Sequence, residues 1–133
     1  MVVQDIRTLL EKMNDYCTKG LESSVGVCVN RGHYEVRWEH MLMFFLEDDR
    51  GDVGAICTHF DIDKSQFKKA VNQELENVHT GNTGKPSFSP PFLEILEQSW
   101  SLSSLALGLS SITSGTMFIA ALERGTHAMS GYA

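Results

Sequence analysis

The sequence predicts an all-α fold. Apolar residues recur at helical spacing along almost the whole chain, and the alternating patterns and hairpin turns typical of strands are missing. With 133 residues, of which 42% are hydrophobic, the chain is large enough to bury a core without disulfides or metals. We therefore expect one helical domain spanning residues 1–133.

The first expected element is a short amphipathic helix within residues 1–13. Ile6, Leu9, Leu10 and Met13 follow the i, i+3, i+4, i+7 pattern, which places them on one stripe of a helix with the charged residues turned outward. An apolar stripe of this kind must be covered, either by the rest of the domain or by a partner.

Two further helices are expected in residues 14–47. Asn14 is a suitable N-cap for a helix over residues 15–29. Small residues on one face of that helix allow another helix to approach closely. After a loop at residues 31–35, a third helix is expected over residues 38–47. Its inward-facing residues are His40, Met41, Phe44 and Phe45.

A short helix over residues 53–59 is expected next, and a longer one follows to about residue 78. Asp63 and Gln66 have the spacing of a capping box at the start of the longer helix. Residues 80–91 contain two glycines and all three prolines of the chain, so no helix can continue through them. We interpret residues 80–91 as an internal linker.

The segments on the two sides of this linker resemble each other. Residues 92–107 and 116–123 repeat the earlier plan of a long helix, a polar loop and a short apolar helix. Shifting the second half back by 76 positions keeps most apolar positions in phase. The sequence therefore predicts two repeats, residues 14–79 and 92–133. The matched pairs are Leu93 with Cys17, Trp100 with Ser24, Ile112 with Val36, Met117 with Met41 and Leu122 with Leu46.

Composition excludes several functions. The formal net charge is −6, which argues against a nucleic-acid partner. The longest apolar run, residues 41–46, is too short to cross a membrane, and the N-terminus lacks the pattern of a signal peptide. We expect a cytoplasmic chain whose cysteines are reduced core residues. The three cysteines are Cys17, Cys28 and Cys57.

No catalytic residue and no metal ligand is predicted. The cysteines could bind zinc together with His33 or His59, but no C-x-x-C pair is present to form a tetrahedral site. His40 opens a short apolar helix, where its natural role is to satisfy buried backbone groups. A phosphate-binding loop and a Gly-x-Ser-x-Gly elbow are also missing. The sequence therefore favours a binding module over an enzyme.

The segment from His33 to His40 resembles a characteristic motif of the Clp amino-terminal domain family. In that family a Val-x-x-Glu-His step opens the second helix of a repeat, and here the step is Val36, Glu39 and His40, followed by an apolar run. The resemblance implies two similar helical repeats about a pseudo-twofold axis. Further helices would complete the second repeat, which looks incomplete because only ten residues follow Glu123.

Other features resemble the ClpV branch of this family, whose parent protein is the AAA+ unfoldase of type VI secretion. They include the additional N-terminal amphipathic helix. The remaining features are the Tyr16-Cys17 pair, Cys28, residues 34–36 and residues 80–82 leading into Ser89-Pro90.

The resemblance implies a substrate-recognition domain. In the ClpV branch this domain binds an amphipathic helix near the N-terminus of the large sheath subunit, so that the contracted sheath is disassembled and recycled. The alternative is the N-domain of another Clp unfoldase or disaggregase, which docks an adaptor or an unfolded substrate. ATP, Mg²⁺ and a hexameric ring are expected of the ATPase domains of the parent, and a monomer is expected for the isolated domain.

We expect the partner helix to lie in an apolar groove with two walls. The stripe of the first helix forms one wall, and apolar residues at the end of the linker form the other. In the alternative interpretation the first helix simply packs on the domain. The predicted peptide-binding residues are Ile6, Leu9, Leu10, Met13, Phe88, Phe92 and Leu93.

Overall fold

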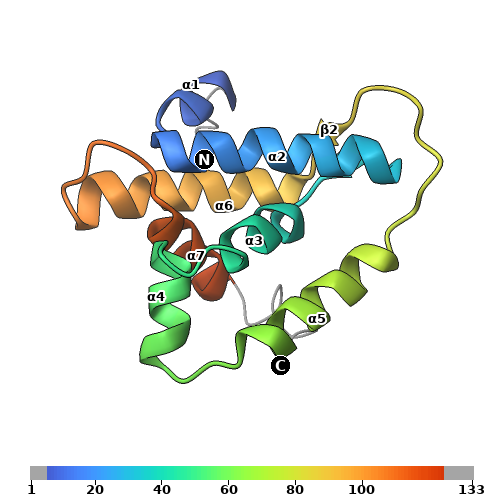
Figure 1. The fold of residues 1–133 in the computed structure, drawn as a ribbon. Helices are drawn as coiled ribbons and strands as arrows, with labels where there is room; N and C mark the ends of the chain where they lie inside the picture. The colour runs from blue at the N-terminus through green and yellow to red at the C-terminus, as the bar shows by residue number, and fades with distance from the viewer. Residues whose placement is uncertain (1–5, 125–133) are drawn as a thin grey trace.

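The predicted all-α fold is confirmed. The structure is a computed structural model that describes residues 6–124, and helices dominate them (Figure 1). The α-helices are α1 (Ile6–Glu11), α2 (Asp15–Arg31), α3 (Trp38–Leu46), α4 (Asp52–His59), α5 (Lys64–Glu76), α6 (Pro90–Ser101) and α7 (Ser114–Arg124). A π-helix, η1 (Leu102–Ala106), follows α6, and the strands are β1 (Glu35–Val36) and β2 (Ser87–Phe88).

The segment that joins the two repeats differs from the prediction in two ways. The helix expected from residue 92 begins at Pro90, because proline is tolerated in the first turn, where its missing N–H has no helical partner. The segment expected to be a linker also contains β2, which pairs in parallel with β1. Each strand has only two residues, too few to show an alternating pattern in the sequence.

The first helix of each repeat is built in the same way. The side chain of Asn14 caps α2 by accepting from the Cys17 N–H, and 75 positions later Ser89 caps α6 by accepting from the Phe92 N–H. In both helices a buried serine hydroxyl, Ser24 or Ser99, donates to the carbonyl four residues earlier. The buried residues of α2 therefore recur 75 positions later. They are Cys17 and Phe92, Gly20 and Ile95, Ser24 and Ser99, and Cys28 and Ser103.

Beyond these helices the spacing between equivalent residues is 76 instead of 75. The left-handed glycine after α2 is Gly32, and its counterpart is Gly108. The extra residue lies between Ser103 and Gly108, within or just after η1, and a π-turn is the usual form that a one-residue insertion takes inside a helix. The predicted shift of 76 was therefore right for the second helix of each repeat and wrong by one residue for the first.

Two short parallel contacts cross between the repeats. Val36 of the first repeat pairs with Phe88, and Ile112 of the second repeat pairs with Met13. The two contacts have equivalent hydrogen bonds, because Ser89 N–H donates to Val36 O at 3.0 Å and Asn14 N–H donates to Ile112 O at 2.9 Å. Each repeat thus contributes the segment before its first helix to the other repeat.

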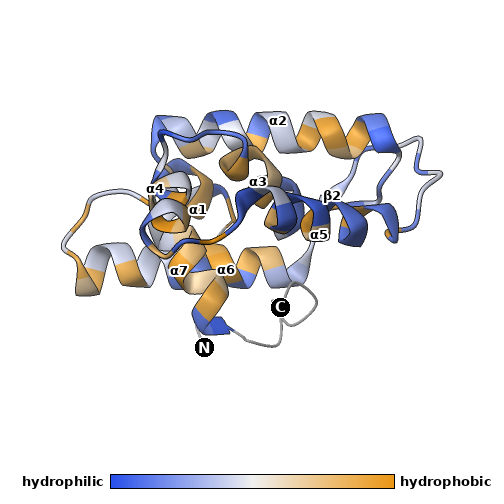
Figure 2. Cartoon of the chain, turned by 60° about the horizontal axis from the view of Figure 1, so that its bottom comes forward, coloured by the Kyte–Doolittle hydropathy of each residue, from blue (hydrophilic) through white to orange (hydrophobic). Residues whose placement is uncertain are grey.

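The core lies around α3 and α7. Helix α3 packs against α2, α4, α5 and α6, and α7 packs against α4 and α6. The largest buried side chains of the core include Phe45, Phe92 and Phe118. Helix α5 is mostly hydrophilic, since only Val71 and Leu75 are buried (Figure 2). None of the helices between residues 6 and 124 is long and apolar enough to cross a membrane.

The close packing of α4 gives a test of the fold. A Cβ atom at Gly54 would lie 2.7 Å from the Asp48 carbonyl oxygen, whereas a Cβ atom at Gly26 would meet nothing within 4 Å. We expect Gly54→Ala to lower the free energy of unfolding by about 2 kcal/mol, because the backbone must move. Gly26→Ala, within α2, should raise it by about 0.5 kcal/mol through helix propensity. Urea unfolding followed by circular dichroism measures both, and equal effects would contradict the packing described.

Candidate functional site

Helix α1 lies outside the two repeats and is anchored by one side. Leu9 and Met13 are buried, with 1% and 7% of their surface exposed, and belong to the core. Leu10 is half-buried, and Ile6 is 38% exposed. The helix packs against α6. The predicted stripe is therefore split, because Leu9 and Met13 fix the helix while Ile6 and Leu10 remain accessible.

The end of α1 is joined to the second repeat. Ile112 N–H donates to Lys12 O at 2.6 Å, next to the contact between Met13 and Ile112. The ammonium group of Lys12 lies 4.9 Å from the centre of the Trp100 ring, a cation–π geometry. These contacts hold α1 in a fixed position on α6 although it is only six residues long.

The other predicted wall is also split. Phe92 is fully buried, because it occupies in α6 the core position that Cys17 occupies in α2. Phe88 and Leu93 are half-buried, and the Phe88 ring lies 6.0 Å from the Phe92 ring. The buried ring of Phe92 therefore packs against the ring of Phe88. Of the three residues predicted for this wall, Phe88 and Leu93 are the ones that a ligand can contact.

The structure does not bring the two sets together at one point. Helix α1 precedes α2, whereas β2 pairs with β1, which follows α2. Helix α2 has 17 residues, which corresponds to about 25 Å. Both views show α1 beside the N-terminal part of α2 and β2 toward the C-terminal part of α2 (Figures 1 and 2). A ligand that touches both sets must be long, and a helix of roughly 14 residues spans about 20 Å.

Three half-buried apolar residues near these walls were missed from the sequence. Trp100 lies two turns after Leu93 on α6, and Leu21 and Val25 lie one turn apart on α2. The i, i+7 spacing of Leu93 and Trp100 could have identified Trp100. Leu21 and Val25 have no such signal, because nothing in the sequence separates a half-buried residue from a fully buried one.

A cluster of Cys28, His33 and His40 lies behind β1. All three residues are buried, and their sulfur and nitrogen atoms lie within 4.8 Å of one another. This is the arrangement of a possible metal site that sequence spacing did not indicate. The Cys28 thiol donates to the Glu35 carbonyl at 3.3 Å, and burial raises its pKa, so the thiol is neutral.

The hydrogen bonds of His40 argue against a metal in this cluster. Arg37 N–H donates to His40 Nδ1 at 2.9 Å, which assigns the imidazole proton to Nε2. Nε2 then donates to His33 Nδ1 at 2.9 Å. A protonated Nε2 cannot coordinate a metal, and losing that proton would require an imidazolate. The predicted structural role of His40, satisfying a buried backbone group, matches this geometry.

In the second repeat, hydroxyl groups instead of imidazoles form the hydrogen bonds at the start of the equivalent helix, α7. Thr116 lies 76 positions after His40, and its Oγ1 accepts from Thr113 N–H at 3.0 Å. Ser103, the counterpart of Cys28, donates to the same oxygen at 3.0 Å. The histidine pair at the start of α3 and the hydroxyl pair at the start of α7 therefore have the same role, which is to accept a hydrogen bond from a backbone N–H.

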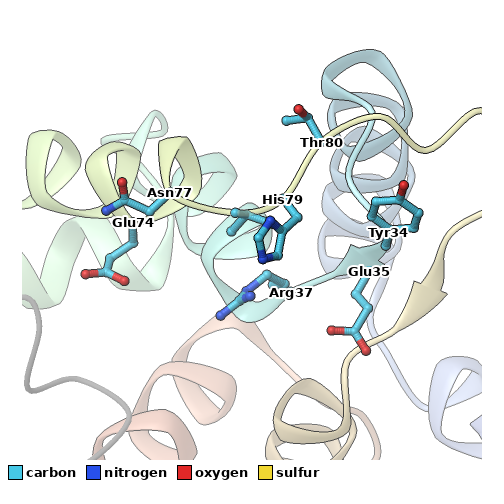
Figure 3. Close-up of a pocket in the computed structure, with 8 residues that line it drawn as sticks. Tyr34, Glu35, Arg37, Glu74, Asn77, His79 and Thr80 are labelled. Atoms are coloured by element: carbon cyan, nitrogen blue, oxygen red, sulfur yellow. The ribbon is translucent and has the colours of Figure 1, made fainter.

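A surface cavity of about 640 Å³ lies between β1 and the end of α5. Figure 3 shows Arg37 and His79 in its middle, with the carboxylates of Glu35 and Glu74 on either side. Arg37 also pairs with Glu39 at 3.3 Å. Because both signs of charge line the cavity and most of the lining is exposed, it does not select one class of ligand.

Comparison with known proteins gives consistent results. The sequence profile of the Clp repeat (R) N-terminal domain matches residues 12–131. Over 116 residues the chain is 28% identical to the chaperone protein ClpB of Yersinia enterocolitica. That alignment covers 87% of this chain and 13% of ClpB, so the chain spans only a small part of that relative.

Two solved structures share the fold over nearly the whole chain. The N-domain of ClpV from Vibrio cholerae has a TM-score of 0.89 and 29% identity, covering 98% of this chain and 81% of that domain. A complex of a ClpV N-domain with a VipB peptide has a TM-score of 0.87 and 28% identity. It covers 99% of this chain and 84% of the matched chain.

The histidine pair predicts a pH dependence of stability. Burial lowers the pKa of both histidines, and burial together with the neighbouring His33 lowers the pKa of His40 from 6.5 to about 4. Between these values the unfolded chain binds protons that the folded chain does not, so stability is full above pH 6.5 and falls as the pH decreases. We expect a loss of about 2 kcal/mol from His40 between about pH 7 and about pH 5.

Urea unfolding at the two pH values measures this loss. His40→Gln keeps an acceptor for the Arg37 N–H but cannot be protonated, so its stability should depend less on pH than that of the wild type. His79→Gln replaces an exposed histidine and should keep the wild-type dependence. Identical pH dependence in the wild type and in His40→Gln would contradict the assignment.

Proposed function

This chain belongs to the Clp repeat N-terminal domain family, and we propose that it is the substrate-recognition domain of a type VI secretion AAA+ ATPase. It binds an amphipathic helix at the N-terminus of the large sheath subunit, which allows the contracted sheath to be disassembled. The observation that carries the proposal is the likeness, over 99% of the chain, to a ClpV N-domain in complex with a VipB peptide.

Helix α1 supports the ClpV assignment. It lies outside the two repeats, yet Lys12, Met13 and Asn14 fix it to the second repeat, and Ile6 and Leu10 stay accessible on it. A chain with this additional wall can offer an apolar surface to a partner helix.

Binding would proceed by desolvation of apolar side chains. The partner helix presents residues at i, i+3, i+4 and i+7 to the accessible side chains of α1 and α6. Burying one large aliphatic side chain contributes about 2 kcal/mol. The predicted walls lie far apart, so a helix of roughly 14 residues is needed to contact both. Charged residues at the edges, Lys12 among them, then select the orientation of the helix.

The role of this domain is binding, and catalysis belongs to the rest of the longer protein. We propose that the longer protein is a cytoplasmic hexameric ATPase that uses ATP and Mg²⁺ in domains outside this chain. The isolated domain would be a monomer. The ATPase pulls on the sheath subunit that the domain has captured, so the domain supplies specificity and the ATPase supplies force.

A second candidate function is favoured by the match to ClpB. That relative is 28% identical over 116 residues, an identity close to that of the ClpV structures. An N-domain of a general Clp unfoldase or disaggregase would dock an adaptor or an unfolded substrate. It would show no preference for the sheath helix over another amphipathic helix of equal length and charge.

The accessible face of α1 gives a test with a matched control. Ile6 is 38% exposed on α1, and Ile62 is 39% exposed at the turn between α4 and α5. We expect Ile6→Asp to weaken binding of a labelled sheath peptide by about tenfold or more, because a charge replaces an apolar contact. Ile62→Asp should bind like the wild type. Fluorescence anisotropy measures the affinities.

The possible failures of this test differ in meaning. If Ile6→Asp binds as tightly as the wild type, α1 is not part of the binding surface. If the wild type binds a scrambled amphipathic helix as well as the sheath helix, the general unfoldase function is correct. Circular dichroism of both variants verifies that the fold is intact.

A further inference from the structure

Three leucines at the end of η1 and in the loop that joins it to α7 are exposed. Leu105, Leu107 and Leu109 have 85%, 53% and 40% of their surface exposed, and we call residues 105–109 the leucine loop. The loop has a defined backbone, because Leu107 N–H donates to Leu102 O at 3.1 Å and Leu109 N–H donates to Ser103 O at 2.7 Å. These backbone hydrogen bonds therefore fix the loop in a conformation that exposes its leucines to solvent.

The sequence segment that contains the leucine loop carries no charged residue. The sequence has no Asp, Glu, Lys, Arg or His between Glu97 and Glu123. Charged residues are common on the surface elsewhere, with 28 of them in 133 residues. A segment that exposes leucines and carries no charged residue of its own is typical of a contact with another protein.

The first repeat contains the counterpart of the end of this loop, Gly108 and Leu109, and there that end is covered. Gly32 corresponds to Gly108, and His33 corresponds to Leu109. The linker crosses this counterpart, where Asn82 N–H donates to Gly32 O at 2.9 Å and the Asn82 side-chain amide donates to His33 O at 3.0 Å. His33 is consequently only 1% exposed, whereas Leu109 is 40% exposed.

The second repeat has no such cover within residues 6–124. Among these residues no amide donates to the carbonyls of Gly108 and Leu109 in the way that Asn82 donates to Gly32 and His33. The segment equivalent to the linker is α1, which is helical and takes a different course. The internal symmetry thus indicates what fits the end of the leucine loop at Gly108 and Leu109, namely an extended chain with an amide side chain.

We propose that the leucine loop binds an extended segment of the sheath subunit next to the helix that α1 recognises. An asparagine or glutamine of that segment would donate to the carbonyls of Gly108 and Leu109, as Asn82 does in the first repeat. Apolar side chains of the segment would cover the leucines. The inference rests on the proposed function, because it assigns the segment to the same partner.

The connection to α1 makes one partner sufficient for both surfaces. The leucine loop leads directly to Ile112, whose N–H donates to Lys12 O and whose carbonyl accepts from Asn14 N–H. An extended chain advances about 3.3 Å per residue, so a few residues bridge from the α1 surface to the loop. The complete site would then recognise both the partner helix and the extended segment next to that helix.

The test compares two synthetic peptides from the N-terminus of the sheath subunit encoded with this protein. One contains the amphipathic helix alone, and the other adds about ten residues on either side of it, enough to reach the loop. We expect the wild type to bind the longer peptide about tenfold more tightly, through the added apolar and amide contacts. Anisotropy titration measures both affinities.

The variant Leu105→Ser/Leu107→Ser/Leu109→Ser should remove this advantage and keep the affinity for the helix alone. The control is Val29→Ser, which changes an apolar residue of α2 that is 54% exposed and should bind like the wild type. Urea unfolding verifies that both variants are folded. In addition, only the longer peptide should shift the methyl NMR signals of the three leucines.

The possible outcomes separate the two proposals. Equal binding of both peptides to the wild type, or an unchanged preference in the leucine variant, overturns the role of the leucine loop and leaves the proposed function intact. Binding of neither peptide overturns both. Self-association of the wild type that the leucine variant abolishes, seen by sedimentation velocity, would show that the loop joins copies of this chain and also overturns the inference.

Discussion

The fold depends on the crossed pairing of the segments that precede α2 and α6. Met13 pairs with Ile112 and Phe88 pairs with Val36, so each repeat begins its first helix from a strand-like contact with the other repeat. All four side chains are buried or half-buried. The crossing sets the position of both N-caps, Asn14 and Ser89, and thereby the direction of the helices that follow. One repeat alone would lack this support.

The surfaces that we propose for binding lie where the two repeats differ. Before α6 the chain is an extended linker that covers the loop at Gly32, whereas before α2 it forms α1 and leaves the loop at Gly108 uncovered. The inserted residue near η1 changes the same loop. The symmetric parts hold the core, and the asymmetric parts, α1 and the leucine loop, provide accessible apolar side chains. Binding surfaces can therefore vary at this end of the molecule without disturbing the core.

The polar groups inside the fold show that equivalent positions need the same hydrogen bond but not the same residue. His40 and Thr116 both accept from the backbone N–H at the start of a helix. The histidine version also needs a neutral partner, His33, whereas the threonine version uses the smaller Ser103. The role of the cluster of Cys28, His33 and His40 is thus explained by its counterpart in the other repeat, which forms the same hydrogen bond at a helix start. The presence of side chains that can bind a metal explains it less well.

The sequence by itself determined the helices, because helical periodicity, the Asn14 and Asp63 caps and the prolines in the first turn of α6 act locally. It also revealed the duplication, since a repeated core repeats its apolar phase. Only the tertiary structure decided which apolar residues are accessible. Leu9, Met13 and Phe92 are buried whereas Ile6, Leu10, Phe88 and Leu93 are not, although all seven looked alike in the sequence. Burial depends on which distant segment packs against a side chain, and the crossed strands that fix this are too short to leave a pattern.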